Sequence, residues 1–258
     1  MNASPIGIFD SGVGGLTVLA EIKKKLPNEN IVYLGDTANF PYGNKIKEDI
    51  VNFSRENIKK LIKKGAKVIV IACGTATSQA LEVLKIEFDL PIIGIIEPTV
   101  NYIKKRDIKK IGVIATEGTI RSGAWERALK NEITDIQVVN KACPMLATIA
   151  EEGRAMSKEG KQVIKEYMKP FKQNNIDKII LGCTHYPIYE KLIKEELGYE
   201  VELINTGNTV AEYLGKLLAR EDMENTTQKD KEIVYLTKPE PYFKNIAKNI
   251  LNFEIKIK

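Results

Sequence analysis

Short runs of apolar, β-branched residues alternate along this chain with longer stretches in which apolar positions recur at helical spacing. Nine of the short runs predict strands, and most are followed by a turn or an amphipathic stretch. The predicted strands are residues 6–10, 30–36, 67–73, 91–96, 110–116, 136–143, 178–183, 201–206 and 232–237. This alternation predicts an α/β protein with mostly parallel sheets, in which strands are buried on both faces.

The pattern also repeats weakly within the chain. The run "IGIFDSGVGGLTV" resembles "IGVIATEGTIRSG", and "KVIVIACGTAT" resembles "KIILGCTHYP". The repeat predicts two similar α/β lobes with an approximate two-fold relation and an active site in the cleft between them. We expect residues 1–97 and 207–258 to form the first lobe and residues 98–206 the second, with the join near Pro98, which interrupts the pattern.

Length and composition describe an ordinary soluble globular protein. Of 258 residues, 43% are hydrophobic and 28% are charged, which leaves ample material for a buried core. We expect no membrane contact, because no run approaches 18 apolar residues, and no secretion signal at the N-terminus. Three widely separated cysteines do not form a disulfide framework, so we expect a cytoplasmic location.

The net charge of +5 comes mostly from lysines near predicted helix ends, as in "EIKKKLPNEN" and "YIKKRDIKK". Lysines there are typical of a solvated surface with favourable charges near helix C-termini. The chain has no basic stripe interleaved with aromatic residues, so we expect no nucleic-acid partner.

Polar residues follow four of the predicted strands, namely Asp10–Ser11, Cys73–Thr75, Thr116 and Cys183–His185. Ligand sites in open α/β sheets form at the carboxyl ends of strands. Two facing lobes would therefore place Cys73 and Cys183 on opposite walls of one cleft. Two such thiols can exchange a proton on opposite faces of one carbon, because a thiolate accepts the proton on one side while a thiol donates one on the other.

Each thiol needs its own partner for this chemistry, because free cysteine has a pKa of roughly 8.5. His185, the only histidine in the chain, lies within plausible reach of Cys183. Asp10 is a candidate partner for Cys73. A helix that starts after either cysteine would also stabilise the thiolate through its dipole.

Small residues beside the cysteines suit the recognition of a carboxylate. Thr75 and Thr184, together with backbone N–H groups, can hold such a group. The turn "FDSGVGGLTV" lacks the Lys-Ser/Thr of a phosphate loop and the GxGxxG spacing of a dinucleotide site. We interpret it as a close backbone approach to a small anion.

Less specific interpretations remain open on these residues alone. A single cysteine at a strand end is often a small buried hydrophobe, and a lone histidine is often structural. Zinc could take Cys73, Cys183 and His185 with Asp10 or Cys143, but the chain lacks the CxxC or HxxxH spacing, and we expect no metal. A two-lobed amino-acid-binding protein without catalysis would show the same cleft.

Five blocks in order along the chain closely resemble the glutamate racemase family. They are "GIFDSGVGGLTV", "GDTANFPYG", "ACGTATS", "ACP" followed by "AEEG", and "LGCTHYP". The resemblance runs from residue 6 to at least residue 210. The block "GCTHYP" favours glutamate racemases over their aspartate racemase relatives, which generally carry a glutamate where His185 stands.

The resemblance implies two α/β lobes, no cofactor, and roles for particular residues. Cys73 and Cys183 would remove and return the α-proton of glutamate, with Asp10 assisting Cys73 and His185 and Glu151 assisting Cys183. The implied substrate contacts are Asp10, Ser11, Tyr42, Gly43, Gly74, Thr75, Thr184 and His185. A racemase for aspartate or another amino acid is the alternative within this class.

The resemblance also implies a cellular context. The product D-glutamate would supply peptidoglycan synthesis in a bacterial cytoplasm, and we expect a homodimer, since family members often are dimers.

Three positions depart from the pattern of the family. Gly74 stands where many relatives have asparagine, so only a backbone contact to the substrate is expected there. Asn39 replaces a common arginine, and "MLATIAEEG" differs from the usual run before Glu151. None of these changes removes a proton-transfer group.

Overall fold

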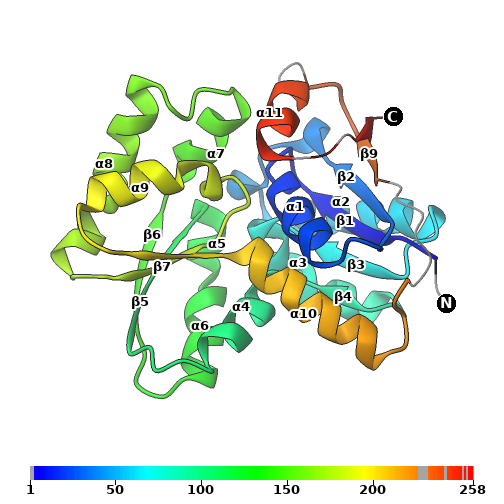
Figure 1. The fold of residues 1–258 in the computed structure, drawn as a ribbon, viewed down its shortest axis with the longest axis horizontal. Coiled ribbons are helices and arrows are strands. Elements are labelled where there is room, and N and C mark those ends of the chain that lie inside the picture. The colour runs from blue at the N-terminus through cyan, green and yellow to red at the C-terminus, as the bar shows by residue number, and fades with distance from the viewer. Residues whose placement is uncertain (1–2, 226–231, 241–242, 252, 254, 258) are drawn as a thin grey trace.

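The computed structural model describes residues 3–225, 232–240, 243–251, 253 and 255–257, and these residues form two separate sheets of parallel strands (Figure 1). The first sheet has the order β10-β9-β2-β1-β3-β4 and the second β6-β5-β7-β8. The first comprises β1 Ile6–Asp10, β2 Ile31–Gly35, β3 Val68–Ile71, β4 Ile92–Ile93, β9 Glu232–Leu236 and β10 Lys256–Ile257. The second comprises β5 Lys110–Ala115, β6 Gln137–Ala142, β7 Lys178–Leu181 and β8 Glu202–Asn205. The predicted α/β class with parallel sheets is confirmed.

Helices connect the strands, because parallel neighbouring strands need a crossover connection. In chain order they are α1 Leu16–Lys25, α2 Lys47–Lys63, α3 Gly74–Glu87, α4 Ile96–Ile103, α5 Glu117–Ser122, α6 Ala124–Glu132, α7 Pro144–Glu151, α8 Lys158–Gln173, α9 Glu190–Leu197, α10 Thr206–Arg220 and α11 Phe243–Ile250. Three short 3₁₀ turns, η1 Thr37–Asn39, η2 Tyr42–Asn44 and η3 Tyr186–Tyr189, lie in the loops.

The sequence repeat corresponds to a repeat in topology. The strand order β2-β1-β3-β4 in the first sheet has the same pattern of chain crossings as β6-β5-β7-β8 in the second. Cys73 lies two residues beyond β3, and Cys183 lies two residues beyond β7, which is the corresponding strand. The fold therefore presents the two thiols at equivalent places in its two halves.

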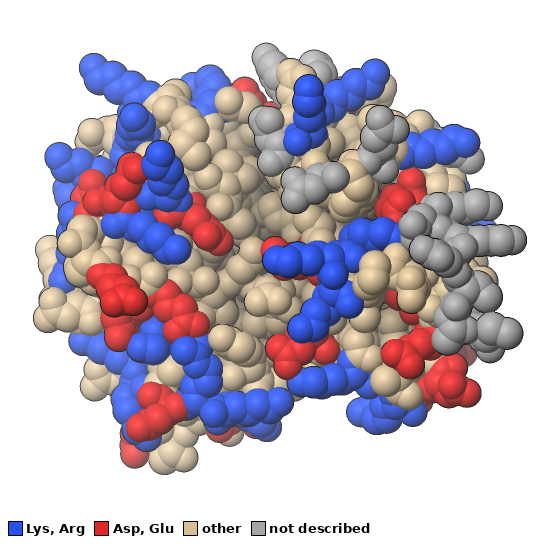
Figure 2. Space-filling model, in the orientation of Figure 1, with Lys and Arg blue, Asp and Glu red and all other residues tan. Residues whose placement is uncertain are grey.

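Charged side chains of both signs are spread over the face shown in Figure 2. Several lysines and arginines pair with neighbouring carboxylates, as Arg55 does with Glu87 at 2.6 Å and Lys104 with Glu132 at 3.0 Å. No helix within the described ranges has the length and apolar character needed to cross a membrane.

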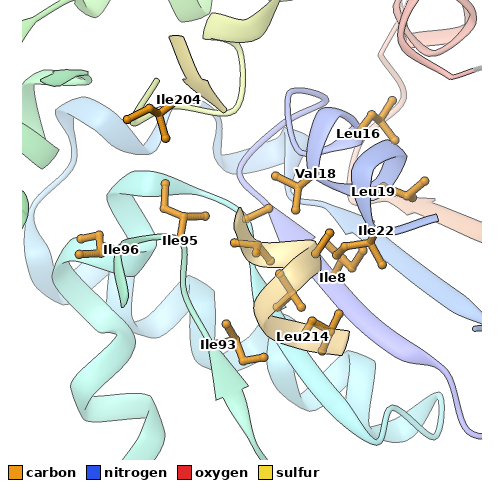
Figure 3. Close-up of a cluster of buried hydrophobic side chains, with 14 of the residues drawn as sticks. Ile8, Leu16, Val18, Leu19, Ile22, Ile93, Ile95, Ile96, Ile204 and Leu214 are labelled. Carbon is orange, nitrogen blue, oxygen red and sulfur yellow. The ribbon is translucent and has the colours of Figure 1, made fainter. Parts of the chain in front are cut away.

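One apolar cluster joins the two sheets. In the first half, Ile22 of α1 lies beside Ile8 of β1 and Leu214 of α10, and Leu16 and Leu19 of α1 belong to the same cluster (Figure 3). The same cluster continues into the second half through β5, α6 and β8, with Val113, Trp125 and Ile204. The halves are thus packed against each other by a shared core, which holds the strand ends of one sheet opposite those of the other.

Two details of the expected pattern are wrong. Pro98 does not interrupt the pattern, because it lies in the first turn of α4, where a backbone N–H has no intrahelical acceptor. The predicted strand 91–96 is only two residues long, since Ile96 already begins that helix. Strand β10 had not been expected, and its two residues are too short for a pattern to reveal. The lobe boundaries at 97/98 and 206/207 stay a prediction.

Candidate active site

A cavity of about 340 Å³ lies between the two halves, where the carboxyl ends of both sheets meet. The structure brings most of the predicted site residues to its wall, namely Ser11, Tyr42, Gly43, Cys73, Gly74, Thr75, Cys183, Thr184 and His185. Asp10 and Glu151 do not line the cavity but lie behind it, with Asp10 fully buried and Glu151 7% exposed. Residues 174 positions apart thus contribute to one site, since Thr184 donates a hydrogen bond to Asp10.

On one wall, a chain of buried polar groups starts at the Cys183 thiol. Its Sγ lies 3.6 Å from His185 Nδ1, and His185 Nε2 lies 2.7 Å from Glu151 Oε1. Burial disfavours the imidazolium, but the hydrogen bonds to Cys183 and Glu151 outweigh it and raise the pKa of His185 well above its usual value. A protonated His185 next to Cys183 stabilises negative charge on that sulfur.

The opposite wall holds Cys73 in a different electrostatic setting. Cys73 is 5% exposed, and its thiol donates a hydrogen bond of 3.5 Å to Ser11 Oγ. Burial, followed by the nearby Asp10 carboxylate, raises the pKa of Cys73 to about 12. Cys73 is the N-cap of α3, and the Ala76 N–H only partly offsets this shift. Cys73 is therefore a protonated thiol at neutral pH.

The helix that starts at Cys73 does not explain why this thiol keeps its proton. The expected helix start follows Cys73 directly, because α3 begins at Gly74, whereas Cys183 precedes only the short η3 turn. A helix start favours a thiolate, so at Cys73 burial and the Asp10 carboxylate outweigh the helix dipole.

Asp10 is held by both halves of the protein. Its Oδ1 accepts the Gly12 N–H at 3.0 Å, and its Oδ2 accepts the Thr184 hydroxyl at 3.2 Å. Burial is the main reason that its pKa is raised. Asp10 influences Cys73 through the field of its carboxylate, which raises the pKa of the thiol, while the sulfur itself bonds to Ser11. The predicted catalytic assistance by Asp10 stays a prediction.

The turn that carries Tyr42 and Gly43 closes one side of the cavity and follows a cis peptide bond between Phe40 and Pro41. The Tyr42 hydroxyl donates to Asp36 Oδ2 at 2.5 Å. This bond fixes the Tyr42 side chain, which is buried, against Asp36. The Phe40 ring lies 5.8 Å from the His185 ring, between centroids.

Some lining residues had not been predicted as contacts. Thr116, a polar residue at a strand end, lines the cavity and shares a hydrogen bond of 2.8 Å with Thr75, with either hydroxyl as donor. Thr116 directly follows β5 as Ser11 directly follows β1, and this symmetry is the signal in the sequence that could reveal it. Met145 and Thr148 on α7 also line the cavity, and only the tertiary arrangement shows this.

The arrangement suits acid–base chemistry on a small anion. The Cys73 thiol, whose pKa is raised, and the Cys183 sulfur beside the His185 imidazole face one cavity, and threonine hydroxyls and the start of α3 surround them. In the described ranges, no group of three or more His, Cys, Asp and Glu side chains has an arrangement that would hold a metal ion.

A comparison with known families matches residues 11–214 to the Asp/Glu/Hydantoin racemases. The chain belongs to this family. Curated relatives in the racemase family include glutamate racemases from Lactococcus lactis subsp. cremoris, 41% identical over 98% of this chain and 93% of the relative, and from Lysinibacillus sphaericus, 41% identical over 97% and 95%.

Solved structures of racemases share the whole fold. A glutamate racemase of Bacillus anthracis aligns over 100% of this chain and 97% of its own, with a TM-score of 0.94 and 37% identity. One from Francisella tularensis, solved in complex with D-glutamate, aligns over 100% and 97%, with a TM-score of 0.92 and 34% identity. An aspartate racemase of Picrophilus torridus, at 19% identity and a TM-score of 0.60, shares the fold alone.

Proposed function

We propose that this protein is a glutamate racemase that interconverts L- and D-glutamate by proton transfer between Cys73 and Cys183, without a cofactor. The curated relatives at 41% identity and the neighbour solved with D-glutamate support glutamate as the substrate. The observation that carries the mechanism is the pair of thiols on facing walls, one beside a protonated imidazole and the other held protonated by burial.

In one direction the Cys183 thiolate removes the α-proton. The C–H bond breaks, its proton forms an S–H bond on Cys183, and the electron pair is left on the substrate. The Cys73 thiol then donates its proton to the opposite face of the α-carbon, which leaves a thiolate at Cys73. The other enantiomer reacts in the reverse sense, and Asp10, Glu151 and His185 assist these steps.

The remaining site residues hold the substrate. General acid–base groups contribute roughly 10²–10⁴-fold each, so donors placed around the substrate carboxylates must supply much of the remaining acceleration. We assign this role to Ser11, Thr75 and Thr184, together with backbone groups at Gly43 and Gly74.

Alanine at either thiol tests the two-base mechanism. Cys73→Ala and Cys183→Ala are each expected to abolish racemisation of both enantiomers, because each direction needs one sulfur as base and the other as acid. Cys143→Ala is the matched control, since this third cysteine is buried outside the cavity wall. Substantial turnover by either active-site variant would contradict the mechanism.

Two other functions give different results in simple assays. An amino-acid-binding protein would bind L-glutamate in calorimetry but leave its optical rotation unchanged in polarimetry. A racemase for aspartate or another amino acid would prefer that substrate in a panel. Deuterium wash-in at the α-carbon of each glutamate enantiomer, with and without added pyridoxal phosphate, tests independence from that cofactor.

We also propose the cellular setting that the family implies. The enzyme would act in the cytoplasm as a homodimer and supply D-glutamate for peptidoglycan. Rescue of a bacterial strain that requires D-glutamate would support this role, and analytical ultracentrifugation would measure the oligomeric state. A monomer at micromolar concentration would contradict the dimer.

A further inference from the structure

The two chain segments that carry the thiols approach each other closely at the backbones of Gly74 and Gly182. Gly74 follows Cys73 at the start of α3, and Gly182 precedes Cys183 at the end of β7. A Cβ atom placed on Gly74 would lie only 2.3 Å from the carbonyl oxygen of Gly182. This contact crosses from the first half of the protein to the second, directly beside both sulfurs.

The neighbour at this contact cannot move aside easily. It is a backbone carbonyl, and the Gly182 N–H is itself fixed by a hydrogen bond of 2.8 Å to Ile114 O. Real Cβ atoms essentially never lie closer than 3.0 Å to another heavy atom, so a side chain at position 74 would shift the backbone by roughly 0.7 Å. At Gly14, by contrast, the nearest atoms belong to the side chains of His185 and Thr184.

The backbone conformation does not explain the glycine. Gly74 is not among the glycines with positive φ, and it occupies a helical position where alanine is intrinsically preferred. What requires glycine at this position is therefore the close approach of the two halves.

We propose that Gly74 is a positioning residue that sets the separation between Cys73 and Cys183. The inference rests on the proposed two-thiol racemase and adds to it the element that spaces the acid and the base. Because the substrate carbon must lie between the sulfurs, any widening at Gly74 moves at least one thiol away from it. A misplacement of about 1 Å can cost roughly 10²-fold in rate.

Gly74→Ala is the decisive variant, compared with the wild type in two measurements. Crystal structures of both proteins with D-glutamate should show the Cα atoms of residues 74 and 182 further apart in the variant, by roughly 0.5 Å or more. The kcat for racemisation should fall by about 10–10²-fold with a smaller change in KM. Deuterium wash-in into the unconverted enantiomer should rise relative to inversion, since exchange needs one thiol and inversion needs both.

Gly215→Ala is the matched control, because Gly215 also lies in a helix, α10, and a Cβ atom there would meet only a methyl group of the Leu26 side chain, at 3.2 Å. It should retain the wild-type kcat. The proposal is overturned if Gly74→Ala keeps the wild-type separation, or if the separation widens while kcat and the wash-in ratio do not change. A wild-type protein that does not racemise glutamate would refute the proposed function, whereas the crystallographic separation would still test the spacing.

Discussion

At the scale of single residues, Cys183 lies against an imidazole that a carboxylate holds, whereas Cys73 lies near a buried carboxylate. The same residue type therefore meets opposite fields on the two walls. A protonated His185 stabilises negative charge on the sulfur of Cys183, while burial and Asp10 keep the proton on the sulfur of Cys73. Such a pair is prepared for acid–base chemistry before substrate binds.

Glu151→Gln tests the source of the charge on His185. The amide removes the negative partner of Nε2, so the pKa of His185 should fall and the imidazolium should be lost at a lower pH than in the wild type. We expect kcat/KM to fall by about 10–10²-fold at pH 8 and by less at pH 6. A pH profile for both enantiomers measures this effect.

Glu152→Gln is the control for this profile, because the neighbouring Glu152 is 43% exposed and pairs with Arg154. Its profile should match the wild type. A Glu151→Gln profile that is lowered equally at all pH values would contradict the role of Glu151 in charging His185.

The raised pKa of Cys73 also predicts how stability changes with pH. The unfolded thiol titrates near pH 8.5, and the folded one near 12, so the native state holds its proton longer. The stability that this pKa shift gives the native state is fully present below pH 8.5 and is lost as pH rises towards 12.

The free energy of unfolding should thus fall by about 2 kcal/mol more between pH 7 and 10 in the wild type than in Cys73→Ser. Parallel urea titrations of the two proteins would measure the difference, and equal slopes would contradict it.

At the scale of elements, the strands and their polar ends could be predicted, because β-branched runs and the chemistry at their ends are local features. The bonds between elements could not. Asp10 bonds to Thr184 of the other half, and the Glu151 carboxylate accepts the Val13 N–H as well as His185. These pairings depend on how two sheets face each other, which no local pattern records.

The turn at Tyr42 shows such a dependence on a distant strand. Asp36 accepts the Tyr42 hydroxyl and also the hydroxyl of Thr237, which follows β9 near the C-terminus. Thr237 also accepts the N–H of Ala38. The end of β9 thus supports a turn that lines the cavity, about 200 residues away in the chain.

Thr237→Val should therefore weaken substrate binding without touching the cavity. Valine removes the hydrogen bond to the Asp36 carboxylate, which is worth about 1.5–3 kcal/mol, and the bond from the Ala38 N–H, so the turn becomes free to move. We expect KM for glutamate to rise by roughly 3–10-fold with a smaller change in kcat. Steady-state kinetics would measure both constants. Thr237→Ser keeps the hydroxyl and should behave like the wild type, so an equal KM effect in the serine variant would contradict the explanation.

At the scale of the whole molecule, the shared apolar cluster makes the two halves depend on each other. The repeat predicted two similar halves, but it gave no sign that side chains from both would form one core. Residues such as Ile204 and Val113 lie in the same cluster as Ile8 and Leu16. The cavity is formed between the halves, so its geometry depends on this packing.

Leu214→Ala tests that dependence. Leu214 on α10 is fully buried beside the first sheet, and its truncation should lower the free energy of unfolding by about 2–5 kcal/mol. Trp125, the only tryptophan, is buried in α6 of the second half and reports that half by fluorescence. Because one cluster joins both residues, the fluorescence transition and the far-ultraviolet circular dichroism transition should shift together to lower urea concentration.

Lys216→Ala is the control, because Lys216 lies on the exposed side of the same helix. The free energy of unfolding from either signal should stay within about 0.5 kcal/mol of the wild type. A fluorescence transition that stays in place while the dichroism signal shifts would show that the halves unfold independently.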